Sequence, residues 1–183
     1  MARLSHDLRY RRRRFRQAAG GLLAVTLAVL STPRPGWFAA GVGLAALGFL
    51  VRLWAAGHVH KNAELAREGP YALVRHPLYT GNLLLGLGFA LASGWIWALP
   101  LTALVFFAFY PDAVRYEDAK LERLFGAPWR EWAASTPALV PRVRRPDLAL
   151  WRGQWSLRRC LVANGEPLYV AVGLALLFYV GVR

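Results

Sequence analysis

Residues 36–51 read GWFAAGVGLAALGFLV, and this uncharged stretch decides the fold class. Another uncharged stretch precedes it at residues 18–31 (AAGGLLAVTLAVLS), and Pro33 and Pro35 between the two mark a tight reversal. Apolar runs of this length are typical of helices that cross a membrane. The pair therefore predicts a helical hairpin in the bilayer.

Three further uncharged stretches follow, at residues 77–93, 94–111 and 167–182. Each is slightly shorter than the roughly 20 residues that cross a bilayer perpendicular to its plane. Aromatic side chains near the ends of such stretches lie at the membrane–water interface and extend the span. We expect an all-α integral membrane helical bundle of about five transmembrane helices. Residues 1–183 are expected to form a single domain.

The composition excludes several classes of soluble protein. The chain is 56% hydrophobic, and its 23 Lys and Arg against 10 Asp and Glu give a net charge of +13. A soluble nucleic-acid-binding protein could carry this charge, but not the long apolar stretches. Cys160 is the one cysteine in the sequence, which excludes a disulfide within the chain and a four-cysteine metal site.

The placement of the basic residues predicts how the chain crosses the membrane. If the N-terminus is cytoplasmic, residues 1–17, 52–76 and 112–166 also face the cytoplasm and hold 21 of the 23 Lys and Arg. Only Arg34 and Arg183 then lie outside. We expect an integral membrane protein with a cytoplasmic N-terminus and active site, and a cleaved signal sequence is the alternative for the first hairpin.

Two basic or glycine-rich motifs have ordinary interpretations in a membrane protein. The arginine run before the first span is expected to lie against anionic lipid headgroups, and no nucleic-acid partner is expected. The stretch from Gly41 to Ala46 imitates a dinucleotide fingerprint, but it lies inside an apolar span. Its small residues predict close packing between helices.

The polar residues concentrate in two segments that face the cytoplasm in this topology. In the first, Gly69-Pro70 breaks any helix, and Pro77 keeps His76 out of the helix that follows. Arg75 and His76 therefore stand just before a helix N-terminus, where free backbone N–H groups can bind a carboxylate or phosphate.

The second segment begins at the membrane exit with an amphipathic helix that carries Glu117 and ends at Gly126. A short helix with Trp129 and Trp132 follows. The alternative for both is a solvated helix that lies on the bilayer, with its tryptophans at the interface.

An ordered set of motifs in these segments resembles a known enzyme family. The set comprises Gly69-Pro70-Tyr71, Arg75-His76-Pro77-Leu78-Tyr79-Thr80-Gly81, Glu117-Asp118 and Leu124-Phe125-Gly126. It is similar to the isoprenylcysteine carboxyl methyltransferase and phospholipid methyltransferase superfamily. The resemblance covers residues 58–142 and implies an integral membrane enzyme with a cytoplasmic pocket of loops and short amphipathic helices, which binds S-adenosylmethionine. Residues 143–183 are left as an interfacial segment and the fifth span.

The resemblance also implies which side chains bind the cofactor. Carried over by position, the cofactor-binding residues are Leu65, Ala66, Tyr71, His76, Pro77, Leu78, Tyr79 and Glu117. The chemistry of these side chains agrees, because tyrosine rings suit a sulfonium or an adenine and a carboxylate suits ribose hydroxyls or an ammonium. His76 has an alternative role as a hydrogen-bonding residue that fixes the loop.

The substrate is expected to be a lipophilic acceptor taken from the membrane, such as a prenylcysteine-like carboxylate, or alternatively a phospholipid amine. Arg75 and Arg115 are the candidates for substrate binding, although Arg75 could instead reach lipid phosphate. In prenylcysteine enzymes an arginine commonly precedes the glutamate by four residues, and Ala113 stands at that place. An amine acceptor would need a general base, for which Glu117, Asp118 and His76 are candidates, so the catalytic residue stays open.

Two alternatives come from other functional classes. One is an NADPH-dependent membrane reductase of the sterol or steroid type. The other is a non-enzymatic membrane protein that binds haem or metal through His58, His60 and His76, although His58 and His60 would point to different sides of a helix. No metal is expected for the methyltransferase, and the sequence leaves the oligomeric state open.

Overall fold

The computed structural model describes residues 2–59, 63–141, 153–163 and 166–183, and over these residues the chain is helical and has no β-strand. The prediction of an all-α fold is therefore confirmed for the described residues. The elements are α1 (Ala2–Val29), α2 (Pro35–His58), η1 (Gly69–Ala72), α3 (Pro77–Ser93), α4 (Ala98–Phe125), α5 (Ala127–Ser135), η3 (Arg159–Ala163) and α6 (Glu166–Gly181).

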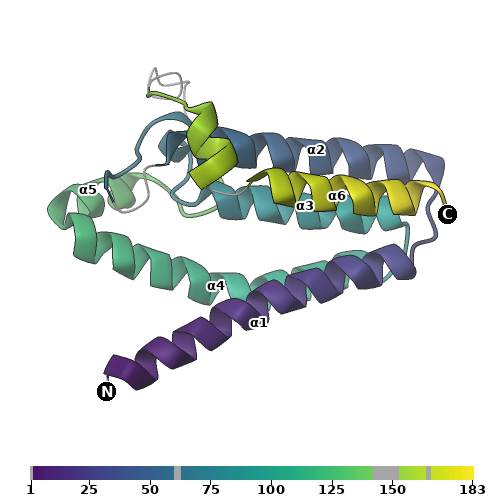
Figure 1. The fold of residues 1–183 in the computed structure, drawn as a ribbon, viewed down its shortest axis with the longest axis horizontal. Coiled ribbons are helices and arrows are strands. Elements are labelled where there is room, and N and C mark those ends of the chain that lie inside the picture. The colour runs from purple at the N-terminus through teal and green to yellow at the C-terminus, as the bar shows by residue number, and fades with distance from the viewer. Residues whose placement is uncertain (1, 60–62, 142–152, 164–165) are drawn as a thin grey trace.

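The long helices run lengthwise along the molecule (Figure 1). One end holds the α1–α2 turn, the α3–α4 turn and the C-terminus, and there the backbone N–H of Thr32 donates to the carbonyl of Ser93 at 2.7 Å. The other end holds η1, α5 and η3. The segments that carry the predicted site residues are thus collected at one end of the bundle.

The central pair of helices, α2 and α3, packs through small residues. A Cβ atom added to Gly41 would overlap the backbone of Ala92, and one added to Gly88 would overlap the backbone of Ala45. Close backbone approach of this kind is characteristic of helix pairs in membranes, where small side chains increase van der Waals contact. The prediction that the stretch from Gly41 to Ala46 packs against another helix is confirmed.

The fourth predicted span has different boundaries in the structure. Helix α4 begins at Ala98 instead of residue 94, because Gly94 adopts a left-handed conformation (φ 64°) that caps α3. The helix also continues past Pro111 to Phe125, so the expected span and the amphipathic helix after it form a single element. Pro111 removes one backbone hydrogen bond but does not end the helix, since its neighbours on both sides favour helical structure.

In the described residues, two helices are long and apolar enough to cross a membrane, namely α2 and α4. Shorter apolar helices cover Phe15–Val29 and Val170–Gly181. The five-span topology and its orientation stay predictions. His60 and residues 143–152 of the interfacial segment lie outside the described residues.

Candidate functional site

The loop before α3 is shaped by local signals and then held by a distant segment. Gly69 adopts a positive φ of 59°, which opens the short helix η1, and Pro77 occupies the first turn of α3. The backbone N–H of Arg75 donates to the carbonyl of Pro137 at 2.8 Å, and that of His76 donates to the carbonyl of Ala138 at 3.0 Å. The chain after α5 therefore fixes Arg75 and His76 in place.

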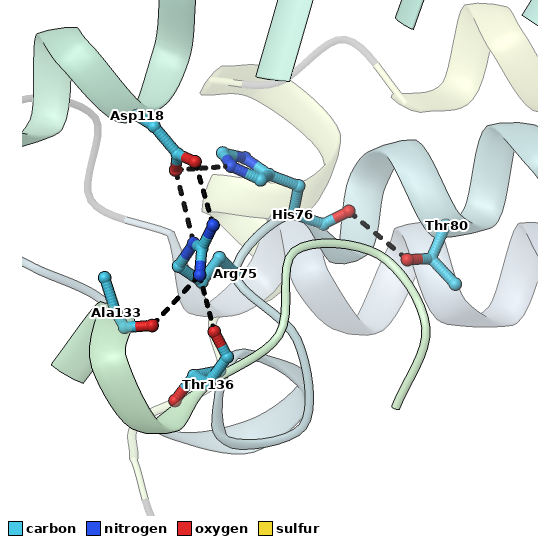
Figure 2. Close-up of polar contacts among 6 residues, drawn as sticks. All are labelled: Arg75, His76, Thr80, Asp118, Ala133 and Thr136. Carbon is cyan, nitrogen blue, oxygen red and sulfur yellow. Dashed lines mark hydrogen bonds and ion pairs between the residues drawn. The ribbon is translucent and has the colours of Figure 1, made fainter. Parts of the chain in front are cut away.

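Asp118 of α4 joins both of these side chains (Figure 2). Its Oδ1 lies 2.8 Å from Nε2 of His76, and its Oδ2 lies 2.9 Å from Nη2 of Arg75. Arg75 Nε also donates to Oδ1 at 3.3 Å, so the guanidinium binds the carboxylate through two nitrogens. His76 is buried, with 6% of its surface exposed, which makes the contact with Asp118 a buried connection between α3 and α4.

The remaining contacts of Arg75 are with α5. Its Nη1 donates to the carbonyl of Ala133 at 3.0 Å and to that of Thr136 at 2.7 Å (Figure 2). Carbonyls at the end of a helix lack partners within the helix, and a basic side chain can satisfy them. The Arg75 guanidinium thus connects α4 to the end of α5, and its expected role in substrate binding stays a prediction.

Four of the predicted cofactor-binding residues gather on one side of this network, in a group that we name the tryptophan cluster. Its buried members are Ala55, Tyr71 and Trp132, and its partly buried members are Val59, Leu65, Ala66, Leu78 and Trp129. The residues come from α2, the loop around η1, the start of α3, and α5. Sequence positions that are far apart are therefore packed together, while their role in binding the cofactor stays a prediction.

Two polar atoms in the tryptophan cluster lack partners. The Nε1 atoms of Trp129 and Trp132 are buried, and neither has a hydrogen-bond acceptor among the described residues. A buried N–H group without an acceptor is uncommon, and it costs about 1–3 kcal/mol. Both indole groups are therefore candidates to donate a hydrogen bond to a ligand.

Tyr79 and Glu117 are not members of the tryptophan cluster. The rings of His76 and Tyr79 are stacked with centroids 5.6 Å apart, and Tyr79 meets Tyr110 of α4 edge to face at 5.4 Å. Glu117 is two turns beyond Tyr110 on the same face of α4. His76 is thus the residue that connects the Asp118 network to the Tyr79 side.

The other predicted site residues differ in their placement. Pro77 is fully buried at the start of α3. Arg115 is exposed, with 80% of its side chain accessible, and it pairs with Asp112 at 3.6 Å on α4. The structure does not bring Arg115 to the group around His76. In the described residues, no group of three or more His, Cys, Asp or Glu could hold a metal ion.

Two polar residues of this end were not among the predicted site residues. Asp118, considered only as a possible base, is the residue that unites Arg75 and His76. Arg52 of α2 is buried, with 6% exposed, and donates from Nη1 to Oδ1 of Asn82. The sequence shows Arg52 as a single arginine after an apolar run, which could have marked it as a candidate. Its partner Asn82 could not be predicted, because it depends on how α2 and α3 pack.

Comparison with known proteins identifies the family. The family model described as phospholipid methyltransferase matches residues 37–128, which is half of the chain. The chain belongs to the phospholipid methyltransferase family. The matched residues run from α2 through α5's first turn and include the Arg75, His76 and Asp118 network. Together with the two apolar helices, this membership makes the chain a membrane protein.

Two methyltransferases are similar to part of the chain. The protein-S-isoprenylcysteine O-methyltransferase of Schizosaccharomyces pombe is 30% identical over 84 residues, which is 46% of this chain and 36% of the relative. Protein-S-isoprenylcysteine O-methyltransferase B of Arabidopsis thaliana is 31% identical over 84 residues, which is 44% of this chain and 41% of that protein. The predicted resemblance is confirmed.

Another relative carries a different kind of name. The cobalt-zinc-cadmium resistance protein CzcN of Cupriavidus metallidurans is 40% identical over 121 residues, which is 64% of this chain and 52% of the relative. The chain thus spans about half the length of this relative, and less of the two methyltransferases. No solved structure matches the chain.

The residues of the site fit S-adenosylmethionine by their chemistry. The two unpartnered indole N–H groups of Trp129 and Trp132 can donate to acceptor atoms of an adenine, a ribose or a carboxylate. In the described part of the chain, Glu117 forms no ion pair, so its carboxylate can accept from an ammonium or from hydroxyl groups. Tyr71 and Tyr79 add aromatic faces, which suit a cation.

Proposed function

We propose that this chain transfers a methyl group from S-adenosylmethionine to a lipophilic acceptor taken from the membrane. Membership of the phospholipid methyltransferase family supports this proposal. The observation that carries it is the tryptophan cluster, where Leu65, Ala66, Tyr71 and Leu78 meet two indole N–H groups that have no acceptor. A prenylcysteine-like carboxylate is the proposed acceptor, and a phospholipid amine is the alternative.

S-adenosylmethionine supplies an electrophilic methyl group on a positively charged sulfur. The protein's part is to hold the acceptor in line with that methyl group and to exclude water. The tryptophan cluster provides the apolar wall, and its Leu65, Ala66, Tyr71 and Leu78 are proposed to bind the cofactor. The buried His76 and Pro77 and the partly buried Tyr79 are proposed to form the boundary between this wall and the acceptor.

The network around Asp118 is proposed to position the site. Since Asp118 holds His76 at 2.8 Å, and His76 stacks on Tyr79, the orientation of Tyr79 depends on α4. Glu117 is proposed to bind the cofactor's ammonium or ribose hydroxyls. A carboxylate acceptor needs no general base, whereas an amine must lose a proton. Glu117 would then be the proposed base, with Asp118 and His76 as the alternatives.

The direct test is binding of S-adenosylmethionine to the purified protein in lipid nanodiscs, measured by calorimetry. We expect binding by the wild type and a loss of about tenfold or more in Glu117→Gln, because a charge-assisted hydrogen bond is removed. Glu122→Gln is the matched control, since Glu122 lies on the same helix and pairs with Arg130 at 3.4 Å. No binding by the wild type would overturn the proposal.

A second measurement addresses the acceptor. Transfer of a labelled methyl group is followed to a farnesylcysteine analogue and to phosphatidylethanolamine in parallel. We expect methylation of the farnesylcysteine analogue, and methylation of phosphatidylethanolamine alone would establish the alternative. If Tyr79→Ala binds the cofactor with unchanged affinity, Tyr79 does not belong to the cofactor site.

A further inference from the structure

Arg16 reaches the site from a helix that the family match does not include. It lies at the start of the apolar part of α1, Phe15–Val29, whereas the match begins at residue 37. Its guanidinium carbon is 5.5 Å from the centre of the Tyr79 ring and 5.8 Å from that of Tyr110. Three helices, α1, α3 and α4, therefore meet at one cation.

Among the residues that the structure describes, this cation is not neutralised by a carboxylate. Arg75, Arg115 and Arg130 each form an ion pair, but among the described residues no carboxylate pairs with Arg16. A guanidinium has five N–H donors, and the two tyrosines beside Arg16 cannot accept from all of them. The half-buried Arg16 thus has donors and charge available for an anion.

The neighbours of Arg16 indicate what kind of anion would fit. Tyr79 connects it to His76 through a ring stack, so an anion on Arg16 lies beside the proposed reaction site. The adjoining surface is apolar, because Phe15 is 65% exposed and Phe107, one turn before Tyr110, is 72% exposed. An amphiphile with an anionic head and an apolar tail matches both features.

We propose that Arg16 binds the anionic head of the membrane amphiphile that accepts the methyl group, and that it places this head beside Tyr79. The inference rests on the proposed function and names the binding residue for its substrate class. The anionic group is either a carboxylate or a phosphate, and the experiment distinguishes the two with one probe of each kind. Arg16 would thereby discriminate charged acceptors from neutral analogues of the same shape.

The test measures affinity without turnover, in phosphatidylcholine nanodiscs that contain the full chain. The probes are N-acetyl-S-farnesylcysteine, its neutral carboxamide, and lysophosphatidylethanolamine. The variants are Arg16→Gln, Arg16→Lys and, as a matched control, Arg34→Gln at the opposite end of the bundle. The affinity for S-adenosylmethionine is measured for each variant.

We expect Arg16→Gln to lower the affinity for the carboxylate probe about tenfold and to leave the affinity for the carboxamide unchanged. Arg16→Lys is expected to retain part of the affinity for the carboxylate probe. A loss confined to lysophosphatidylethanolamine supports the inference with phosphate as the anion. Equal changes for charged and neutral probes, no change at all, or only a lower melting temperature would overturn it. A wild type that does not bind S-adenosylmethionine contradicts the proposed function instead, while the probe selectivity still decides the role of Arg16.

Discussion

His76 and Asp118 are joined by a hydrogen bond of 2.8 Å between Nε2 and Oδ1, across 42 positions of the chain. The same carboxylate binds Arg75, whose guanidinium also holds the last carbonyls of α5. One carboxylate therefore ties the loop before α3 to α4 and, through Arg75, to α5. Changes at Asp118 are expected to affect the whole end of the bundle that carries the site.

Replacement of Asp118 by asparagine tests this connection. Asp118→Asn keeps the shape but removes the charge that Arg75 and His76 share, and we expect a loss of about 2 kcal/mol in the free energy of unfolding. Denaturation in detergent micelles, followed by tryptophan fluorescence, measures it. Glu122→Gln is the control, because Glu122 forms an exposed ion pair on the same helix. Equal stability of the two variants would contradict the role given to Asp118.

The glycines between α2 and α3 provide a second test. Gly88→Ala would place a Cβ against the backbone of Ala45 and Gly41, so we expect destabilisation by about 1–3 kcal/mol. Gly43→Ala is the matched control, since no atom lies within 4 Å of a Cβ added there. We expect Gly43→Ala to be neutral or slightly stabilising. Thermal unfolding of both variants in the same detergent compares them, and similar melting temperatures would exclude the close packing.

The unpartnered indoles predict opposite effects on stability and binding. Trp132→Phe removes an N–H group that lacks an acceptor, so we expect unchanged or higher stability without ligand. We also expect affinity for S-adenosylmethionine to fall about fivefold, which calorimetry in nanodiscs measures. Trp37→Phe is the control, because Trp37 is 56% exposed at the start of α2. Wild-type affinity in Trp132→Phe would show that its N–H does not contact the ligand.

The segment before η3 docks on the end of α2 through Gly57. The indole Nε1 of Trp155 donates to the carbonyl of Leu53 at 3.2 Å, and the backbone N–H of Ser156 donates to that of Gly57 at 3.0 Å. A Cβ on Gly57 would overlap the Trp155 ring, so we expect Gly57→Ala to displace the segment.

Limited trypsin digestion measures this displacement, with faster cleavage after Arg158 or Arg159 as the expected result. Gly20→Ala is the control, since no atom lies within 4 Å of a Cβ added at Gly20. Cleavage of Gly57→Ala at the wild-type rate would mean that Trp155 does not hold the segment.

The predicted topology is tested by single cysteines at the two ends of the bundle. Arg183→Cys and Ala127→Cys, each combined with Cys160→Ser, are labelled with a membrane-impermeant maleimide in intact cells. Because 21 of the 23 Lys and Arg are assigned to the cytoplasmic side, we expect labelling of Arg183→Cys alone before lysis. Labelling of Ala127→Cys in intact cells would contradict the predicted orientation and indicate the opposite one.

Local signals predicted much of the fold. Pro77 and Gly94 bound α3 where the sequence indicated, because proline suits the first turn of a helix and glycine tolerates a left-handed cap. The expected separation between the span at residues 94–111 and the helix after it was wrong, because a proline inside a helix removes one hydrogen bond without always ending the helix, and α4 continues past Pro111 to Phe125. The small residues around Gly41 predicted close packing, but not which residues of α3 they would meet.

The sequence by itself determined the helical class, the family and the loop that holds His76, because apolar runs, prolines, glycines and ordered motifs are properties of neighbouring residues. Only the tertiary structure decided that Asp118 binds Arg75 and His76, while Glu117 lies on the face of α4 whose Tyr110 meets Tyr79. Glu117 and Asp118 are adjacent in sequence, but successive side chains on a helix point about 100° apart. Which partner each carboxylate meets, and that Arg16 reaches Tyr79, therefore depends on how the helices are rotated and packed.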